Sequence, residues 1–108
     1  MSATPKILGQ AKPTALATVT LFTVDINTTV EFSIFINNQS TAYDGYTISL
    51  IPQGMTANSA RELAYNTQLA GGATVSFSGL YLNTGDSVTV SSSFGNCAFM
   101  ATGLVFSQ

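Results

Sequence analysis

Apolar and polar residues alternate along most of this chain, with the period of two that is typical of β-strands. The clearest case is Thr28–Asn37, where the apolar face holds Val30, Phe32, Ile34 and Ile36 and the polar face holds Glu31, Ser33, Phe35 and Asn37. Phe35 is the one aromatic residue on that polar face, so we expect either ordinary exposure or a contact with another subunit. Alternation of the same kind predicts further strands at 15–24, 46–51, 61–69, 73–82, 87–92 and 97–106.

Turn residues separate these segments and predict how some of them connect. The sequence Asn83-Thr84-Gly85-Asp86 predicts a tight hairpin between its flanking strands, and the strand at 46–51 is expected to pair with the one at 28–37. The alternation slips by one residue at Gly79, which indicates a β-bulge. The segment Arg61–Leu69 is compatible with a strand or a short helical turn, and the β character of the chain favours the strand.

About eight short strands at regular spacing, with no long helical pattern, predict an all-β fold. We expect a single antiparallel β-sandwich or jelly-roll-like domain over residues 14–108. Residues 1–13 contain two prolines and precede the first dense apolar stretch, so they are expected to form an extended N-terminal arm outside the core. The last strand is apolar on both faces, which indicates a central position or one covered by another subunit.

Composition narrows the choice of partners. Of 108 residues, 45% are hydrophobic but only 7% are charged, with a net charge of −2, so electrostatic repulsion between copies is weak and a homo-oligomer is expected. The three cations, Lys6, Lys12 and Arg61, form no basic stripe, which argues against binding to nucleic acid or to an anionic membrane. The first ten residues lack the features of a secretory signal, and no apolar run reaches the length of a membrane span, so synthesis in a cytoplasm is expected.

The residue types needed for catalysis are scarce. Without histidine, neither a Ser-His-Asp triad nor a Cys-His pair can form, and the usual zinc sites lack ligands. A carboxylate pair of the glycosidase type remains formally possible, but most of the acids lie at turns, where they bond to backbone amides: Asp25, Asp44 and Asp86. We therefore expect no enzyme activity, no catalytic residue, no cofactor and no metal. The single cysteine, Cys97, is interpreted as a buried apolar side chain, with an intermolecular disulfide as the alternative.

Several short motifs occur in an order that resembles small virion proteins of tailed bacteriophages. They are Ile7-Leu8-Gly9-Gln10, Pro13, Leu21-Phe22-Thr23-Val24, Val30–Asn37 and Leu82-Asn83-Thr84-Gly85-Asp86-Ser87-Val88. In that group a Leu-Gly-Gln start, a Leu-Tyr-Thr-Val-like strand and a Leu-x-x-Gly-Asp hairpin recur in the same order. This sequence has Phe22 in place of the more usual tyrosine.

The resemblance implies a structural protein of the virion, made in the host cytoplasm. It would be a capsid decoration (cement) protein that contacts the major capsid protein, or a tail- or fibre-associated subunit that contacts tail proteins. The candidate interface residues are apolar positions of the arm and aromatic residues expected to be exposed, namely Pro5, Ile7, Leu8, Pro13, Phe35, Phe94 and Phe99. The alternative is a receptor- or glycan-binding module, which predicts that Tyr43, Tyr46 and Tyr65 gather on one loop end.

Overall fold

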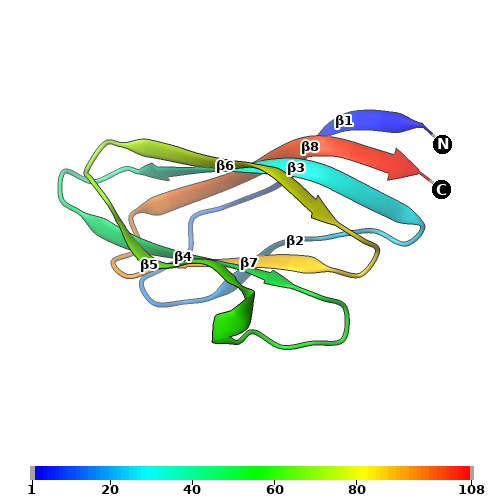
Figure 1. Ribbon diagram of the computed structural model, residues 1–108. Coiled ribbons are helices and arrows are strands. Elements are labelled where there is room, and N and C mark those ends of the chain that lie inside the picture. The colour runs from blue at the N-terminus through cyan, green and yellow to red at the C-terminus, as the bar shows by residue number, and fades with distance from the viewer. Residues whose placement is uncertain (1, 108) are drawn as a thin grey trace.

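The computed structural model describes residues 2–107, which form two antiparallel four-stranded sheets packed face to face (Figure 1). The first sheet has the order β1-β8-β3-β6 and the second the order β2-β7-β4-β5. The strand bounds are β1 Ala3–Ala11, β2 Val19–Thr23, β3 Thr28–Asn38, β4 Asp44–Ile51, β5 Glu62–Leu69, β6 Thr74–Leu82, β7 Ser87–Ser92 and β8 Cys97–Ser107. Apart from β4 and β5, consecutive strands lie in different sheets, as in a jelly roll, so the predicted fold class is confirmed.

The core forms where the inner faces of the sheets meet, and β3 shows why. The four apolar residues predicted to share one face of this strand are all at most 3% exposed. Phe32 of the first sheet meets Phe22 of the second edge to face, with ring centroids 5.2 Å apart. A comparable contact joins Phe77 of β6 to Tyr46 of β4 at 6.3 Å. Aromatic side chains thus span the space between the sheets.

The predicted bulge and the uncertain segment both have counterparts in the structure. Phe32 pairs with Leu80 and Ile34 with Phe77, so β6 carries one extra residue at Gly79, whose φ of 73° is in the region that favours glycine. The segment predicted as a strand at 61–69 is β5, preceded by a 3-10 turn, η1, at Ser59–Arg61. The strand is therefore the correct alternative for this segment, and the short helical turn lies just before it.

Two predicted pairings are wrong. β3 lies between β8 and β6, whereas β4 lies between β7 and β5, so the strands at 28–37 and 46–51 are in different sheets. The turn at 83–86 likewise links β6 to β7 across the sandwich and forms no hairpin. Alternation shows which face of a strand is buried, but the inner faces of both sheets have the same pattern, so alternation does not identify the sheet.

The prediction of a separate arm over residues 1–13 also needs correction. Ala3–Ala11 is β1, the edge strand of the first sheet, and it pairs with β8 from Ala3↔Phe106 to Ala11↔Phe99. Both strands run side by side to their ends (Figure 1), where the Ser107 N–H donates to the Ser2 carbonyl at 2.9 Å. The strand is extended and mostly exposed, as expected of an arm, but it satisfies backbone groups that would otherwise leave β8 as an open edge. Residue 13 is therefore not a domain boundary.

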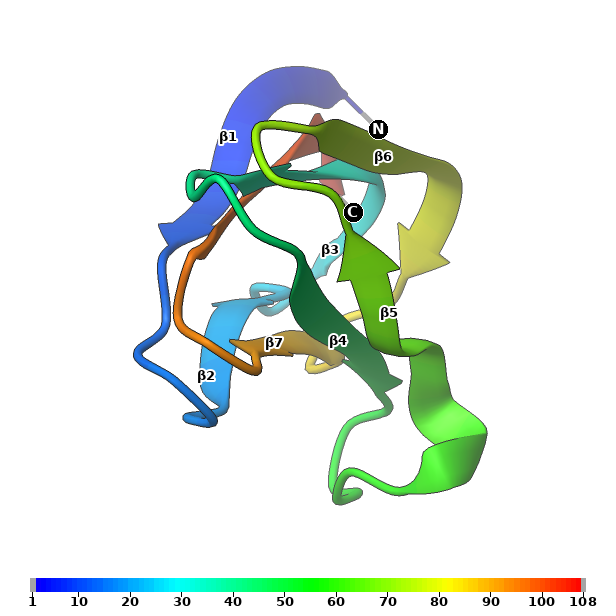
Figure 2. The ribbon, with the colours of Figure 1, turned by 90° about the vertical axis from the view of Figure 1, so that its left-hand side faces the viewer.

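The longest exposed segment is the connection between β4 and β5, which projects away from the sandwich in Figure 2. Pro52 to Ala60 are all exposed. The Arg61 side chain ties this loop together by donating to the Thr56 carbonyl at 2.7 Å and to the Met55 sulfur at 3.1 Å. No helix within residues 2–107 is long and apolar enough to cross a membrane.

Candidate functional site

Two of the acidic residues, Asp44 and Asp86, hold loops in place. Asp44 is fully buried, and its two carboxylate oxygens accept the N–H groups of Phe94 and Asn96, each at 2.9 Å. Asp86 likewise accepts from the N–H groups of Gln53 and Asn83, each at 2.9 Å. Backbone bonding was predicted for these carboxylates, but Asp44 reaches across to a loop 50 residues away, which the sequence did not indicate.

The two glutamates lie on different sheets. Glu31 lies on the outer side of β3 and accepts the Tyr81 hydroxyl at 3.3 Å. Glu62 begins β5 and pairs in register with Ser49. Within the described part of the chain, no three His, Cys, Asp or Glu side chains are grouped so as to hold a metal ion.

Asn38 is a structural polar residue that the sequence analysis missed. It is fully buried at the end of β3, where its amide nitrogen donates to the carbonyls of Ala42 and Leu69, each at 2.8 Å. Its side-chain oxygen accepts from the Ser40 N–H at 3.0 Å and from the Ser40 hydroxyl at 2.9 Å. The available signal was its phase, since Asn38 continues the buried face that runs through Ile36. A buried amide with all these bonds fixes the path of the chain between the sheets.

Cys97 is the first residue of β8, and its side chain is fully buried, in agreement with its interpretation as an apolar side chain. Burial raises the pKa of its thiol to about 12, and the adjacent Asp44 carboxylate adds to the effect. A thiol in this position is protected from disulfide exchange because both access and the thiolate form are suppressed.

The raised pKa of Cys97 predicts a loss of stability in alkaline solution. The folded state keeps the proton up to about pH 12, whereas the unfolded thiol ionises near its ordinary value of 9.0, so the free energy of unfolding falls as the pH rises through this range. Urea unfolding at pH 8 and pH 10 should show a smaller fall for Cys97→Ala than for the wild type. Burial also raises the pKa of Tyr46, and the Cys97 thiolate adds to that effect, so the difference between the two proteins measures Cys97 together with its interaction with Tyr46. An identical fall in both proteins would contradict the assignment.

The predicted interface residues fall into two groups. Pro5, Ile7, Phe35 and Phe94 are exposed, with Ile7 at 58% and Phe94 at 67%. Leu8 is half-buried against the core, and Pro13 and Phe99 are buried, so the predicted exposure of Phe99 is wrong. Because β8 is apolar on both faces, alternation could not orient Phe99. Its pairing with Ile36 of β3, a fully buried residue, turns it inward.

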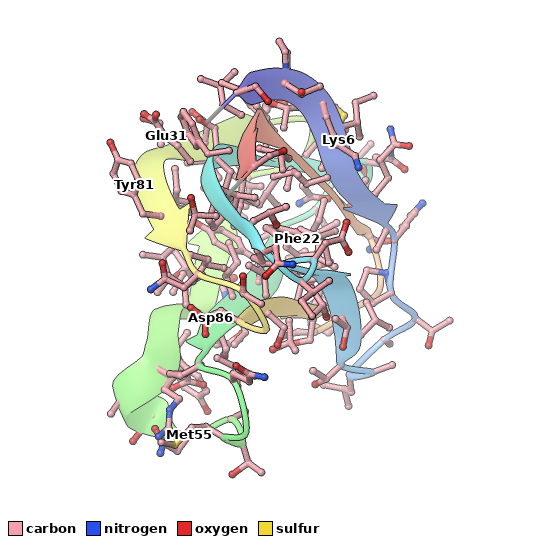
Figure 3. All side chains as sticks on the ribbon, turned by 90° about the vertical axis from the view of Figure 1, so that its right-hand side faces the viewer. Lys6, Phe22, Glu31, Met55, Tyr81 and Asp86 are labelled. Atoms are coloured by element: carbon pink, nitrogen blue, oxygen red, sulfur yellow. The ribbon has the colours of Figure 1, made fainter. Side chains whose placement is uncertain are left out.

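The outer face of the first sheet carries a band of apolar side chains along β1 and β8. In register, the apolar residues of this face are Pro5, Ile7, Phe35, Tyr81, Ala98, Met100, Leu104 and Phe106. The polar residues of the face lie mainly on β3 and β6, and they are Gln10, Thr29, Glu31, Ser33, Asn37, Thr74, Ser76 and Thr102. A hollow of about 660 Å³ lies at one end of this face, lined by Phe35, Met100, Gln10 and Lys12 among others. Figure 3 shows Glu31 and Tyr81 side by side on this outer side, with Phe22 between the sheets. We call this surface the apolar face.

The outer face of the second sheet differs sharply. Val88 and Val90 of β7 point into the core, which leaves Ser87, Thr89 and Ser91 on the outside. Thr89 pairs with Thr20 of β2, and Ser91 pairs with Thr47 of β4, so hydroxyl groups continue across three strands. We call this surface the hydroxyl face. An antiparallel sheet with one wet side has this composition, whereas the apolar face departs from it.

The tyrosines do not form the cluster expected of a glycan-binding module. Tyr43 is 63% exposed and Tyr65 is 71% exposed, but Tyr46 is buried at 3% with its ring against Phe77. A stacking platform made of all three is therefore excluded by the position of Tyr46.

The fold is similar to that of chains from solved virus particles. No protein-family model and no curated protein matches the sequence. A chain of the T13 particle of infectious bursal disease virus aligns with 95% of this chain at a TM-score of 0.55 and 14% identity. A chain of the Gx strain of the same virus aligns with 96% at a TM-score of 0.53 and 16% identity. This chain spans only 30% and 31% of the length of those two chains, and at such identities the likeness concerns the fold alone.

Proposed function

We propose that this protein is a non-enzymatic structural subunit of a virus particle, and more specifically a capsid decoration protein of a bacteriophage virion. The observation that carries the proposal is the apolar face on a jelly roll whose neighbours are chains of icosahedral particles. A monomer keeps the large side chains Ile7, Phe35 and Tyr81 of this face exposed to water, so the face is suited to contact with other protein. The order of short motifs that resembles small phage virion proteins supports the more specific part of the proposal.

Such a subunit acts by burying surface. A decoration protein stabilises a shell when it contacts several shell subunits at once, because every contact must break before the shell can open. The sandwich is suited to this role, since its charged residues are few and its inner faces are already satisfied by one core. No bond-making chemistry is required of any side chain.

The copy number in purified particles tests the proposal. Quantitative mass spectrometry should find this protein in amounts comparable to the major shell subunit. A small fixed complement per particle would instead support a tail- or fibre-associated subunit, and complete absence from particles would overturn the proposal. Particles stripped of the protein should also release their contents at lower temperature than decorated ones.

A further inference from the structure

We infer that the apolar face is a self-association surface, on which a second copy of this chain packs sheet against sheet about a two-fold axis. The inference goes beyond the proposed function, because it concerns the purified protein and needs no particle. It names a second copy as the protein that contacts this face, so a dimer, and not a single chain, would meet the shell. It rests on the composition of the face, its size and the positions of its charges.

Composition distinguishes this face from the other large flat surface of the molecule. The central strand β8 directs Met100, Leu104 and Phe106 outward, and the neighbouring strands add Ile7 and Phe35. The hydroxyl face presents Ser and Thr at the equivalent outward positions of its own central strand β7. Both sheets pack on the same core, so the core does not explain the difference between their outer faces. We attribute the difference to a protein layer that covers the outer face of the first sheet. Apolar side chains on both sides of a strand are typical of a sheet that is covered on both sides.

The size of the face is sufficient for a specific dimer. Four strands spaced about 4.8 Å apart, with a rise of about 3.4 Å per residue over the 11 residues of β8, give a surface of roughly 35 Å by 19 Å. Two copies would bury roughly 1,300 Å² in total, which lies within the range of about 1,200 to 2,000 Å² for stable interfaces. Sheets stack face to face in this way inside β-sandwiches.

The charges of the face suit an antiparallel pair. Among residues 2–107, Glu31 is the one acidic side chain on this face, and it lies in register with Leu104 toward one end of β8. Lys12 borders the hollow at the opposite end, beside Met100. Lys6 is directed away, because it lines the space between β1 and β2. A two-fold axis across the strands therefore brings the Lys12 end of each copy toward the Glu31 end of the other, with no like charges opposed.

Sedimentation equilibrium of the purified protein tests the inference. The wild type should form a dimer with a Kd of roughly 1 to 100 µM, measured from about 1 to about 200 µM protein. Thr102→Glu places a carboxylate near the centre of the face and, by symmetry, near its copy, whereas Met100→Glu places one opposite the Glu31 end of the other copy, so each should raise the Kd by about 100-fold or more. The matched control is Thr89→Glu, which adds the same charge to the centre of the hydroxyl face and should leave the Kd unchanged.

Circular dichroism on the same samples checks that each variant is folded. If Met100→Glu is unfolded, Thr102→Glu alone tests the inference, because Thr102 is already polar and its replacement is better tolerated. A wild type that remains monomeric at the highest concentration would overturn the inference. If Thr89→Glu abolishes the dimer, or if both variants of the apolar face still dimerise, the contact lies on another surface. Either result would also overturn the inference. A monomer that is nevertheless abundant in particles would leave the proposed virion role intact.

Discussion

Phe32→Ala is expected to destabilise the fold by about 3–5 kcal/mol, which is a large share of the 5–15 kcal/mol that holds a typical domain together. The Phe32 side chain is 2% exposed and meets Phe22 of the opposite sheet. Its removal leaves a cavity between two layers whose backbones are fixed by hydrogen bonds and cannot collapse into it. Urea unfolding followed by circular dichroism measures the loss.

The control for this prediction lies on the same strand. Phe35→Ala removes the same side chain from the outer side of β3, where it is 38% exposed, and should cost about 1 kcal/mol or less in dilute protein, where monomers dominate. Equal losses at the two positions would mean that the inter-sheet contact contributes little beyond local strand structure.

Asp44→Ala is expected to cost about 3 kcal/mol, because it removes a fully buried acceptor from two part-buried N–H groups of the loop between β7 and β8. Asp86→Ala is the matched comparison, since that carboxylate also accepts two N–H groups at 2.9 Å but from exposed loops. Water can replace it there, so about 1 kcal/mol is expected. Denaturant unfolding of the three proteins at one pH measures both differences. A larger loss for Asp86→Ala would show that burial does not govern the strength of these loop anchors.

The sequence predicted local structure well and the arrangement of strands poorly. The alternation in β3 identified its buried face, and the phase slip at Gly79 located a bulge, because each signal is contained within one strand. The partners of a strand depend on residues far away in the sequence. The pairing of β3 with β8 joins Thr28 to Ser107, and no turn signal indicates it.

The sequence predicted only part of the candidate surface. The apolar content of both faces of β8 predicted a central position or one covered by another subunit, but it did not predict that Phe99 would face the core and Met100 the outside. Asn38 and Asp44 looked like ordinary turn residues. Their importance comes from partners such as Leu69 and Asn96, which only the folded chain brings to them.

The position of β8 has a consequence for how the protein is made. It is the last of the eight strands along the chain, yet it lies between β1 and β3 and joins them into one sheet. While the ribosome is still producing the earlier strands, β1 has no partner and the first sheet cannot close. Folding therefore waits for the final strand, and pairing over such long sequence separations is slow. The apolar face does not exist until β8 is in place, so self-association through it cannot precede the closure of the first sheet.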